Sequence, residues 1–298
     1  MNKIKNIGGQ AVIEGVMMKA SRNWTVAVRD PKGEIHLKRE PVGKLPAFLK
    51  LPVIRGTVAL YQALSIGMRA LEFSASKAYD DGEEKPLSPF AILSTMGFAF
   101  VLGIALFIFL PLYVTKLAGA VLSVVSRSSL VFNLVDGLIR VFIFLGYVFA
   151  IGLWKDMRRI FEYHGAEHKV IHAYEAGREL DVDSVRAFSP QHPRCGTSFL
   201  LIVMVISILV FSCIPQSWPF AGKFLSRLIL IPVIAGVSYE LLRLSAKIKN
   251  NPFLNILVLP GLMLQRLTTR EPDDSQIEVA IAAVKEVLKS EEGNDREA

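Results

Sequence analysis

The sequence predicts a mainly α-helical membrane protein with about four transmembrane helices, a small N-terminal α+β cytoplasmic region and a C-terminal amphipathic helix. Apolar residues make up 52% of the 298 residues, charged residues only 20%, and the mean hydropathy is +0.40. The apolar residues are gathered into runs long enough to cross a bilayer, and most lysines and arginines lie between those runs. This composition excludes a disordered or fibrous protein.

A β-hairpin is expected near the N-terminus. Residues 24–29 (WTVAVR) and 34–39 (EIHLKR) alternate between apolar and polar side chains, and residues 30–33 (DPKG) between them suit a type I turn. Residues 10–18 (QAVIEGVMM) are expected to add a further strand and complete a small sheet. Glu14 lies within this apolar strand, and we interpret it as an edge or salt-bridge residue rather than a metal ligand.

A long amphipathic helix is predicted for residues 53–80, because apolar side chains recur there with helical spacing. The segment 80–89 (DDGEEKPLSP) then interrupts the pattern with charge, glycine and proline. It separates a predicted cytoplasmic region, residues 1–86, from a predicted transmembrane region, residues 87–245.

Four membrane-spanning helices are predicted within the transmembrane region. The first contains no charged residue over 25 residues, which at about 1.5 Å per residue exceeds the roughly 30 Å hydrocarbon core. Asp136 and Arg140 interrupt the second, and they are expected to pair with each other or with Arg227 of the fourth, because isolated charges in hydrocarbon are expensive. The predicted spans are residues 90–114, 130–154, 198–214 and 224–244.

The last region, residues 246–298, is expected to hold an interfacial segment and a C-terminal cytoplasmic helix. Residues 253–264 (FLNILVLPGLML) are too few to cross the bilayer and contain a Pro-Gly break, which favours an interfacial or re-entrant segment. Ser275 and Glu278 have the spacing of a capping box, which would begin a soluble helix. Its apolar face would contain Ile277, Ile281, Val284 and Leu288.

The distribution of positive charge predicts that both termini are cytoplasmic. Lysine and arginine number 14 in residues 1–86, seven in 154–197 and seven after residue 245, against two in 116–128 and one in 215–223. No nucleic-acid partner is expected despite the net charge of +7, because residues 154–197 hold seven basic and seven acidic side chains interleaved. The expected partners are the lipid bilayer and a membrane-associated substrate or protein, and the oligomeric state stays open.

A histidine-rich cytoplasmic loop, residues 154–197, is expected to carry the chemistry. Its first part (YHGAEHKVIHAYEAG) follows the second span without a proline, so the helix is expected to continue into the cytoplasm and to end at Gly177. The loop contains four of the five histidines and one of the two cysteines, namely His164, His168, His172, His192 and Cys195.

A metal-binding pair is expected on this helix. His164 and His168 lie four residues apart and therefore on one helical face, which lets two imidazoles bind one metal ion. Glu167 completes an H-x-x-E-H pattern, the inverse of the zinc-protease motif in which the glutamate acts as general base. His172 is an alternative partner for His168, but it lies about 12 Å along the axis from His164, too far for one ion to bind all three. We prefer the first pair because it places Glu167 beside the ion.

The turn before the third span offers the remaining ligands. His192 and Cys195 lie at the two ends of the sequence HPRC and supply an imidazole and a thiolate. One of them with the helix pair would leave an open position for water, as a catalytic zinc site requires, whereas both together would close the site and make it structural. Cys213 is 18 residues from Cys195, roughly 27 Å along a helix, so a disulfide between them is excluded.

The sequence supports three hypotheses for the function. The first is a zinc-dependent membrane enzyme with a cytosol-facing site, a hydrolase of an amide or ester in a membrane-associated substrate, with Glu167 activating water. The second is a non-catalytic scaffold or accessory protein in which a structural metal ties the loop to the third span. The third is a transporter component that uses Asp136, Arg140 and Arg227, for which four spans without a visible repeat would require oligomerisation.

Four long motifs carry a resemblance to a known family. They are GGQAVIEGVMMKA, EYHGAEHKVIHAYE, HPRCGTSFL and PGLMLQRLTTREPDDSQIEVAIAAV, and they are distributed over almost the whole chain. The chain resembles the YqhQ-like bacterial membrane proteins, a family of unknown function formerly labelled predicted metal-dependent enzymes. The resemblance implies a bacterial cytoplasmic membrane and a bound metal, and it supplies no established reaction.

Overall fold

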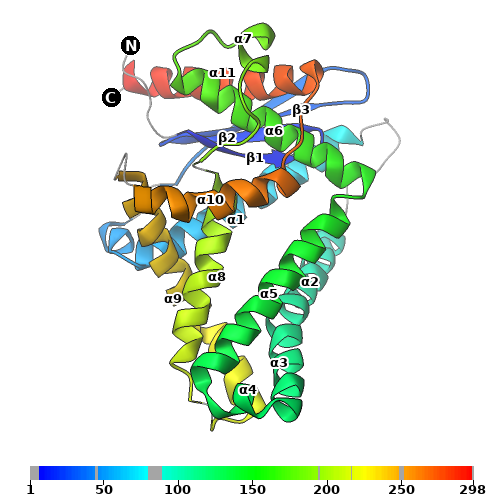
Figure 1. The fold of residues 1–298 in the computed structure, drawn as a ribbon. Helices are drawn as coiled ribbons and strands as arrows, with labels where there is room; N and C mark the ends of the chain where they lie inside the picture. Colours follow the sequence, from blue (N-terminus) through cyan, green and yellow to red (C-terminus); the bar gives the residue numbers. More distant parts are fainter. Residues whose placement is uncertain are drawn as a thin grey trace.

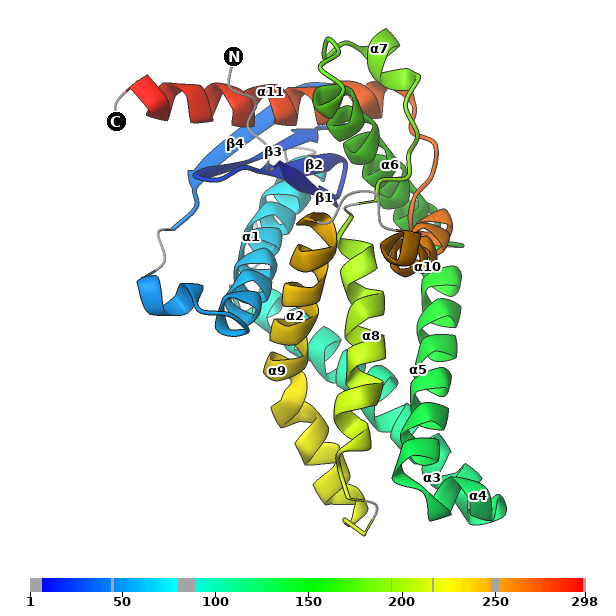
Figure 2. The same ribbon diagram turned by 60° about the vertical axis from the view of Figure 1, so that its left-hand side comes forward.

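The computed structural model describes residues 7–43, 46–79, 89–193, 195–215, 217–247 and 252–296. A region that contains a β-sheet forms one end of the molecule, and long apolar helices extend away from it (Figures 1 and 2). This arrangement confirms the predicted mainly helical membrane fold with an N-terminal sheet. The predicted boundary segment 80–89 lies outside the described residues, apart from its last residue.

The sheet has four antiparallel strands in sequence order: β1 (Gly8–Val12), β2 (Gly15–Lys19), β3 (Asn23–Arg29) and β4 (Ile35–Pro41). The predicted hairpin is confirmed as β3 and β4. The single strand expected over residues 10–18 is wrong, because the chain reverses at Glu14 (φ +49°) and forms two strands. Gly15 permits the close approach of β3 to the start of β2, since a Cβ there would lie 2.2 Å from the carbonyl oxygen of Ala27.

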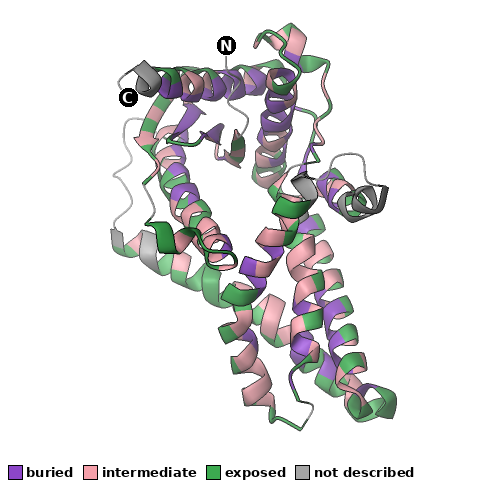
Figure 3. Cartoon of the chain, turned by 90° about the vertical axis from the view of Figure 1, so that its left-hand side faces the viewer, coloured by how far each residue is buried: buried purple, intermediate pink, exposed green. Residues whose placement is uncertain are grey.

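Helices cover both faces of the sheet. Helix α1 (Ile54–Ala78), which confirms the predicted amphipathic helix, packs on one face against Met17, Val26 and Val28. Helices α6 (Lys155–Glu175) and α11 (Asp274–Arg296) pack on the other. Because neighbouring strand residues face opposite layers, both sets of side chains are buried. Figure 3 shows the resulting concentration of buried residues along α11 and α6.

The C-terminal helix begins with a different cap from the one predicted. The carboxylate of Asp273 accepts the backbone N–H of Gln276 at 2.9 Å, and the side-chain oxygen of Gln276 accepts the N–H of Asp273 at 3.0 Å. This reciprocal pair is a capping box, whereas the predicted pair of Ser275 and Glu278 is not. Glu278 instead accepts a hydrogen bond from Arg29 at 2.7 Å and joins the helix to the sheet.

The apolar helices match the predicted spans. Within the described residues, three helical segments are long and apolar enough to cross a bilayer, and Phe199–Ser212 is a shorter apolar helix. The chain is therefore a multi-pass membrane protein with three to four spans. The segments are Ser94–Val121, formed by α2 (Pro89–Ile104), η2 (Ala105–Phe109) and α3 (Leu110–Val121), then α5 (Ser129–Ile151) and Phe220–Leu244 within α9 (Phe220–Lys247). The shorter apolar helix belongs to α8 (Gly196–Ser212), and the remaining short elements are η1 (Ala47–Lys50), α4 (Ser123–Arg127) and α7 (Val182–Arg186).

The second span does not continue into the histidine-rich helix, contrary to the sequence prediction. Helix α5 ends at Ile151 and α6 begins at Lys155, with a tight turn between them. At Gly152 a Cβ would lie 3.2 Å from the Phe161 ring, so the missing side chain leaves room for the start of α6 to pack against the end of α5. The break allows α6 to lie on the sheet instead of extending α5 (Figure 1). Its predicted end at Gly177 is confirmed by a left-handed φ of +68°.

Helix α10 (Pro252–Thr268) crosses the end of α8 between the sheet region and the spans (Figure 1). The predicted Pro-Gly break does not occur, since the helix continues through Pro260. Proline at this position removes one backbone hydrogen bond but does not end the helix.

The charges within the spans pair as expected. Asp136 accepts hydrogen bonds from Arg140 at 2.6 Å and from Arg227 at 2.5 Å. Arg227 also donates to Asn133 at 3.0 Å, and Arg140 to Ser207 at 2.8 Å. The cluster thus joins α5, α8 and α9 through one buried carboxylate.

Replacing Gly165 by alanine is expected to destabilise the fold. A Cβ at this position of α6 would lie 2.0 Å from the carbonyl oxygen of Arg270, in the segment before α11. Overpacking of this kind costs about 1–3 kcal/mol. The control is Gly146→Ala in α5, where nothing lies within 4 Å of the added atom. Thermal unfolding in detergent should show a loss only for the first variant, and equal melting temperatures would contradict the close approach.

Candidate metal site

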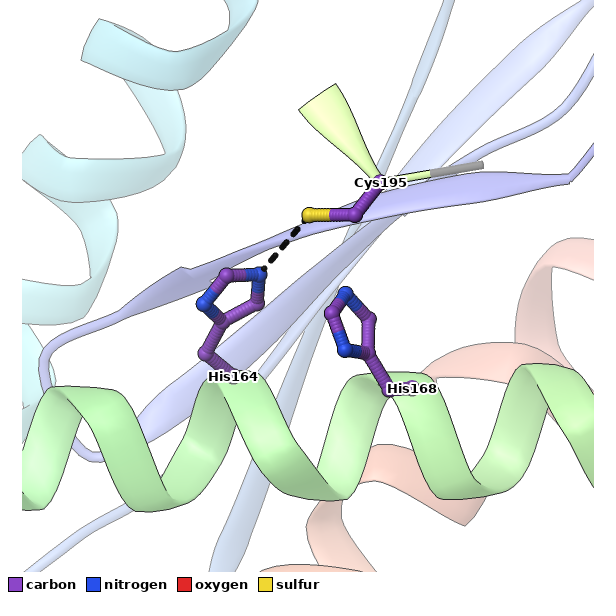
Figure 4. A group of neighbouring side chains, drawn as sticks. All are labelled: His164, His168 and Cys195. Carbon is purple, nitrogen blue, oxygen red and sulfur yellow. Dashed lines mark hydrogen bonds between the residues drawn. The ribbon is translucent and has the colours of Figure 1, made fainter. Parts of the chain in front are cut away.

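Three of the predicted ligands converge beside the sheet. His164 and His168 come from adjacent turns of α6, and Cys195 is the N-cap residue of α8. One nitrogen from each ring and the sulfur all lie within 4.8 Å of one another, and this is the one such group among the described residues. His164 Nε2 is 3.3 Å from the Cys195 sulfur, and both rings extend from α6 on the side of that sulfur (Figure 4).

Each imidazole is held by a backbone carbonyl through its other nitrogen. His164 Nδ1 donates to the carbonyl of Thr268 at 2.8 Å, and His168 Nδ1 donates to that of Pro190 at 2.7 Å. Because a carbonyl only accepts, the proton is on Nδ1 in both rings and Nε2 keeps its lone pair. Metal-binding histidines have this arrangement, in which a second hydrogen bond fixes the tautomer and the ring orientation.

His168 presents a buried nitrogen without a partner. Its side chain is 1% exposed, and within the described part of the chain Nε2 makes no hydrogen bond. Burial, followed by the nearby charge of His164, lowers the pKa of His168 to about 2, so the ring is neutral at pH 7. A buried unsatisfied polar atom costs about 1–3 kcal/mol. A metal ion at Nε2 would remove that cost, so the residues present fit a metal.

Cys195 supplies the sulfur from the N-cap position of the apolar helix α8. Thr197 donates both its backbone N–H, at 3.5 Å, and its hydroxyl, at 3.3 Å, to the sulfur. Burial raises the pKa of the thiol, and the two bonds from Thr197 act in the opposite direction. A bound cation would favour the thiolate strongly. Two neutral imidazoles and one thiolate are a donor set that zinc accepts.

Glu167 lies beside this group, between α6 and the edge strand β1. It is 5% exposed and accepts the backbone N–H of Gly9 at 3.0 Å. Burial is the largest effect and raises the pKa of Glu167 to about 7. His164 acts against this rise, Cys195 adds to it, and the hydrogen bond from Gly9 acts against it. A Cβ on Gly9 would lie 2.8 Å from the Glu167 side chain, so only glycine permits this contact. Sequence reasoning missed the contact, and the signal that could have found it is the pair of glycines that opens β1.

His192 and His172 lie outside the three-residue group. The His192 ring is 5.8 Å from that of His168 and 4.3 Å from that of His172. His192 Nε2 is 3.5 Å from the Glu175 carboxylate, and His172 Nε2 donates to the carbonyl of Gln191 at 2.9 Å. From the HPRC turn, the structure therefore brings Cys195 to the group. Arg194 of this turn is outside the described residues.

The turn is held in place by a residue that sequence reasoning missed. Gln265 of α10 is fully buried, accepts the backbone N–H of His192 at 2.8 Å and donates to its carbonyl at 2.9 Å. Together with Thr268, which holds His164, it makes α10 a support for the group. The signal in the sequence that could have identified this residue is a glutamine within a mostly apolar helix.

Glu14 does not belong to the metal group. Its carboxylate pairs with the guanidinium of Arg159 and accepts a hydrogen bond from the hydroxyl of Tyr163 at 3.1 Å. Both partners are on α6, so the ion pair fixes the turn between β1 and β2 against that helix. The salt-bridge interpretation of Glu14 is confirmed.

A cavity of about 1390 Å³ opens next to the metal group. Glu167, His168, His192 and Cys195 form part of its wall, and the rest comes from the strand ends, α1 and the segment before it. A substrate in this cavity would therefore lie beside both the candidate ligands and the buried carboxylate.

Comparison with known proteins identifies the family. The profile of the family described as "Protein of unknown function (DUF1385)" matches residues 51–290. The chain is 34% identical over 299 residues to "Uncharacterized protein YqhQ" of Bacillus subtilis (strain 168), covering 95% of this chain and 92% of that relative. No solved structure matches it. The chain therefore belongs to the DUF1385 family, and the expected resemblance to YqhQ is confirmed.

Proposed function

We propose that this protein is a zinc-dependent hydrolase at the membrane surface, in which His164, His168 and Cys195 bind the ion. The observation that carries the proposal is the pair of imidazoles whose Nδ1 atoms are committed to carbonyls, while the buried Nε2 of His168 has no hydrogen-bond partner in the described chain. Three protein ligands leave the fourth zinc position for water, as catalytic sites require.

Each residue then has a distinct role. When bound, zinc would polarise the carbonyl of an amide or ester and lower the pKa of water. Glu167 accepts the proton of the attacking water and delivers it to the departing nitrogen or oxygen as the acyl bond breaks. The Gly9 N–H orients that carboxylate from the sheet edge.

The membrane determines where the reaction occurs. Cys195 caps a membrane helix, so the site lies where that helix meets the sheet region. We propose that this face is cytoplasmic in a bacterial inner membrane, because the lysine-rich and arginine-rich segments gather there. A membrane-associated substrate could reach such a site without leaving the bilayer surface.

Replacing Glu167 by glutamine is expected to keep the metal and to lower turnover about 10²- to 10⁴-fold, because the proton acceptor is lost while the ligands remain. Whole-membrane extract in detergent is incubated with purified protein, and newly formed acids, alcohols and amines are quantified by mass spectrometry. Metal content is measured on the same samples. Equal product formation by both proteins, or none by the metal-containing wild type, would contradict the proposal.

The second candidate is a non-catalytic scaffold with a structural metal. It is favoured by the origin of the ligands, since α6 belongs to the sheet layer and Cys195 to a membrane helix, so one ion would tie the two regions together. On this alternative, Glu167→Gln changes neither product formation nor stability, whereas His168→Ala lowers the melting temperature. Arg140 and Arg227 both pair with Asp136, so these residues give no comparable support to the transporter hypothesis.

A further inference from the structure

We propose that the cavity beside the metal group binds the phosphate-bearing headgroup of an anionic lipid drawn from the adjoining bilayer. The inference rests on the proposed function in one respect, because it names the substrate class of that hydrolase. Binding itself requires no hydrolysis and can be tested separately. Three features support a lipid occupant: the charge of the wall, the helix that begins at it, and the apolar side chains in and near the wall.

The charged side chains of the wall are mostly cationic. Lys19, Arg22 and Lys50 line the cavity, and Glu167 is the one acidic residue among the described lining residues. Lys19 is half-buried, and in the described chain no carboxylate lies within salt-bridge distance of Lys19 or Lys50. An ammonium group removed from water without an anion is costly, and a phosphate would offset that cost.

Helix α8 adds to the positive potential. Gly196, its first residue, lines the cavity, and the helix runs from there for 17 residues into the membrane region. The N-terminus of such a helix carries a partial positive charge of about one half and favours anions, and Cys195 accepts one of its first N–H groups, that of Thr197. This contribution acts in the same cavity as the three basic side chains, so a negatively charged headgroup is attracted from two sides.

Part of the remaining wall is apolar. Met17, Ile66 and Ile171 are among its apolar residues. Beside Lys50, Phe48 of η1 (63%) and Leu51 just after it (53%) are exposed. A cation next to exposed aromatic and aliphatic side chains is typical of a membrane interface. The volume of about 1390 Å³ exceeds the roughly 300–1,000 Å³ of ordinary ligand pockets. The cavity therefore suits a headgroup together with the first part of its acyl chains.

The test measures binding to the full-length, metal-containing protein in a non-ionic detergent. The probes are dihexanoyl phosphatidylglycerol, dihexanoyl phosphatidylcholine and glycerol 3-phosphate, and affinity is measured by titration calorimetry. We expect phosphatidylglycerol to bind at least tenfold more tightly than either other probe. The zwitterionic lipid tests the charge of the wall, and the water-soluble phosphate tests the apolar part.

Variants assign that binding to the cavity. Lys19→Gln with Lys50→Gln should weaken phosphatidylglycerol binding tenfold or more and leave phosphatidylcholine binding unchanged. Lys50→Gln alone, at an exposed position, should show part of the loss even if the double variant folds poorly. The matched control is Lys32→Gln in the exposed turn between β3 and β4, which should bind as the wild type does.

Three outcomes would overturn the inference: equal affinity for both lipids, equal affinity for glycerol 3-phosphate, or unchanged binding by the lysine variants. Failure of the proposed hydrolase gives a different pattern. Glu167→Gln would then keep wild-type product formation, while the lysine-dependent preference for phosphatidylglycerol persisted. If the protein shows no preference for phosphatidylglycerol but Glu167→Gln still lowers product formation, the lipid proposal is wrong and the hydrolase proposal stands.

Discussion

Alanine at position 168 is expected to leave the purified protein with less than about a tenth of the metal that the wild type retains. The substitution removes one of three ligand atoms, and the two that remain, His164 Nε2 and the Cys195 sulfur, form an incomplete site. Metal affinity in such sites comes from ligands held together by the fold, so the loss of one weakens binding by orders of magnitude. Metal content per chain is measured by plasma mass spectrometry after gel filtration.

The control for this experiment is His172→Ala, one helical turn further along α6. His172 Nε2 is committed to the carbonyl of Gln191, so its removal should leave the metal in place. The comparison also decides between the two histidine pairs that spacing alone allows. Equal metal in wild type and His168→Ala would remove the basis of the site, and loss of metal from both variants would assign the ion to His168 and His172.

Local patterns predicted much of the fold because their causes are local. The alternation in residues 24–29 and 34–39 and the turn between them produced the hairpin, and uninterrupted apolar length produced the spans. The failures occurred where one residue reverses or stops an element. A left-handed Glu14 split one predicted strand into two, and the turn at Gly152 ended α5 before α6 began.

From the sequence, the candidate site could be predicted only as far as the pair of histidines on one helix. Spacing brought His164 and His168 to one face, but three partners of the group come from distant segments: Gly9, Pro190 and Thr268. Gly9 and Glu167 are 158 residues apart. Such contacts depend on how the C-terminal helices and the N-terminal sheet pack on α6, which no local pattern encodes. The choice of Cys195 over His192 likewise depended on the direction of a turn.

Replacing Asp136 by alanine is expected to lower the free energy of unfolding by about 3–5 kcal/mol, because it leaves two buried arginines without their anion. Asp136 and Arg227 are each 1% exposed, and both arginines depend on this one carboxylate within the described residues. Stability is measured by reversible denaturant titration in mixed micelles. The matched control is Glu240→Gln, which breaks the half-exposed ion pair with Arg55 near the other end of α9 and should have a much smaller effect.

A triple replacement tests the structural role of this cluster. Leucine at Asp136 with methionine at Arg140 and Arg227 removes all three charges and keeps apolar volume, so it should recover most of the stability lost by Asp136→Ala. Recovery would mean that the carboxylate serves chiefly to neutralise its neighbours, as the bonds from both arginines indicate. If the triple variant stays as unstable as Asp136→Ala, the structural assignment fails. Metal content should be the same in all of these variants, because none of the substituted residues belongs to the group of His164, His168 and Cys195.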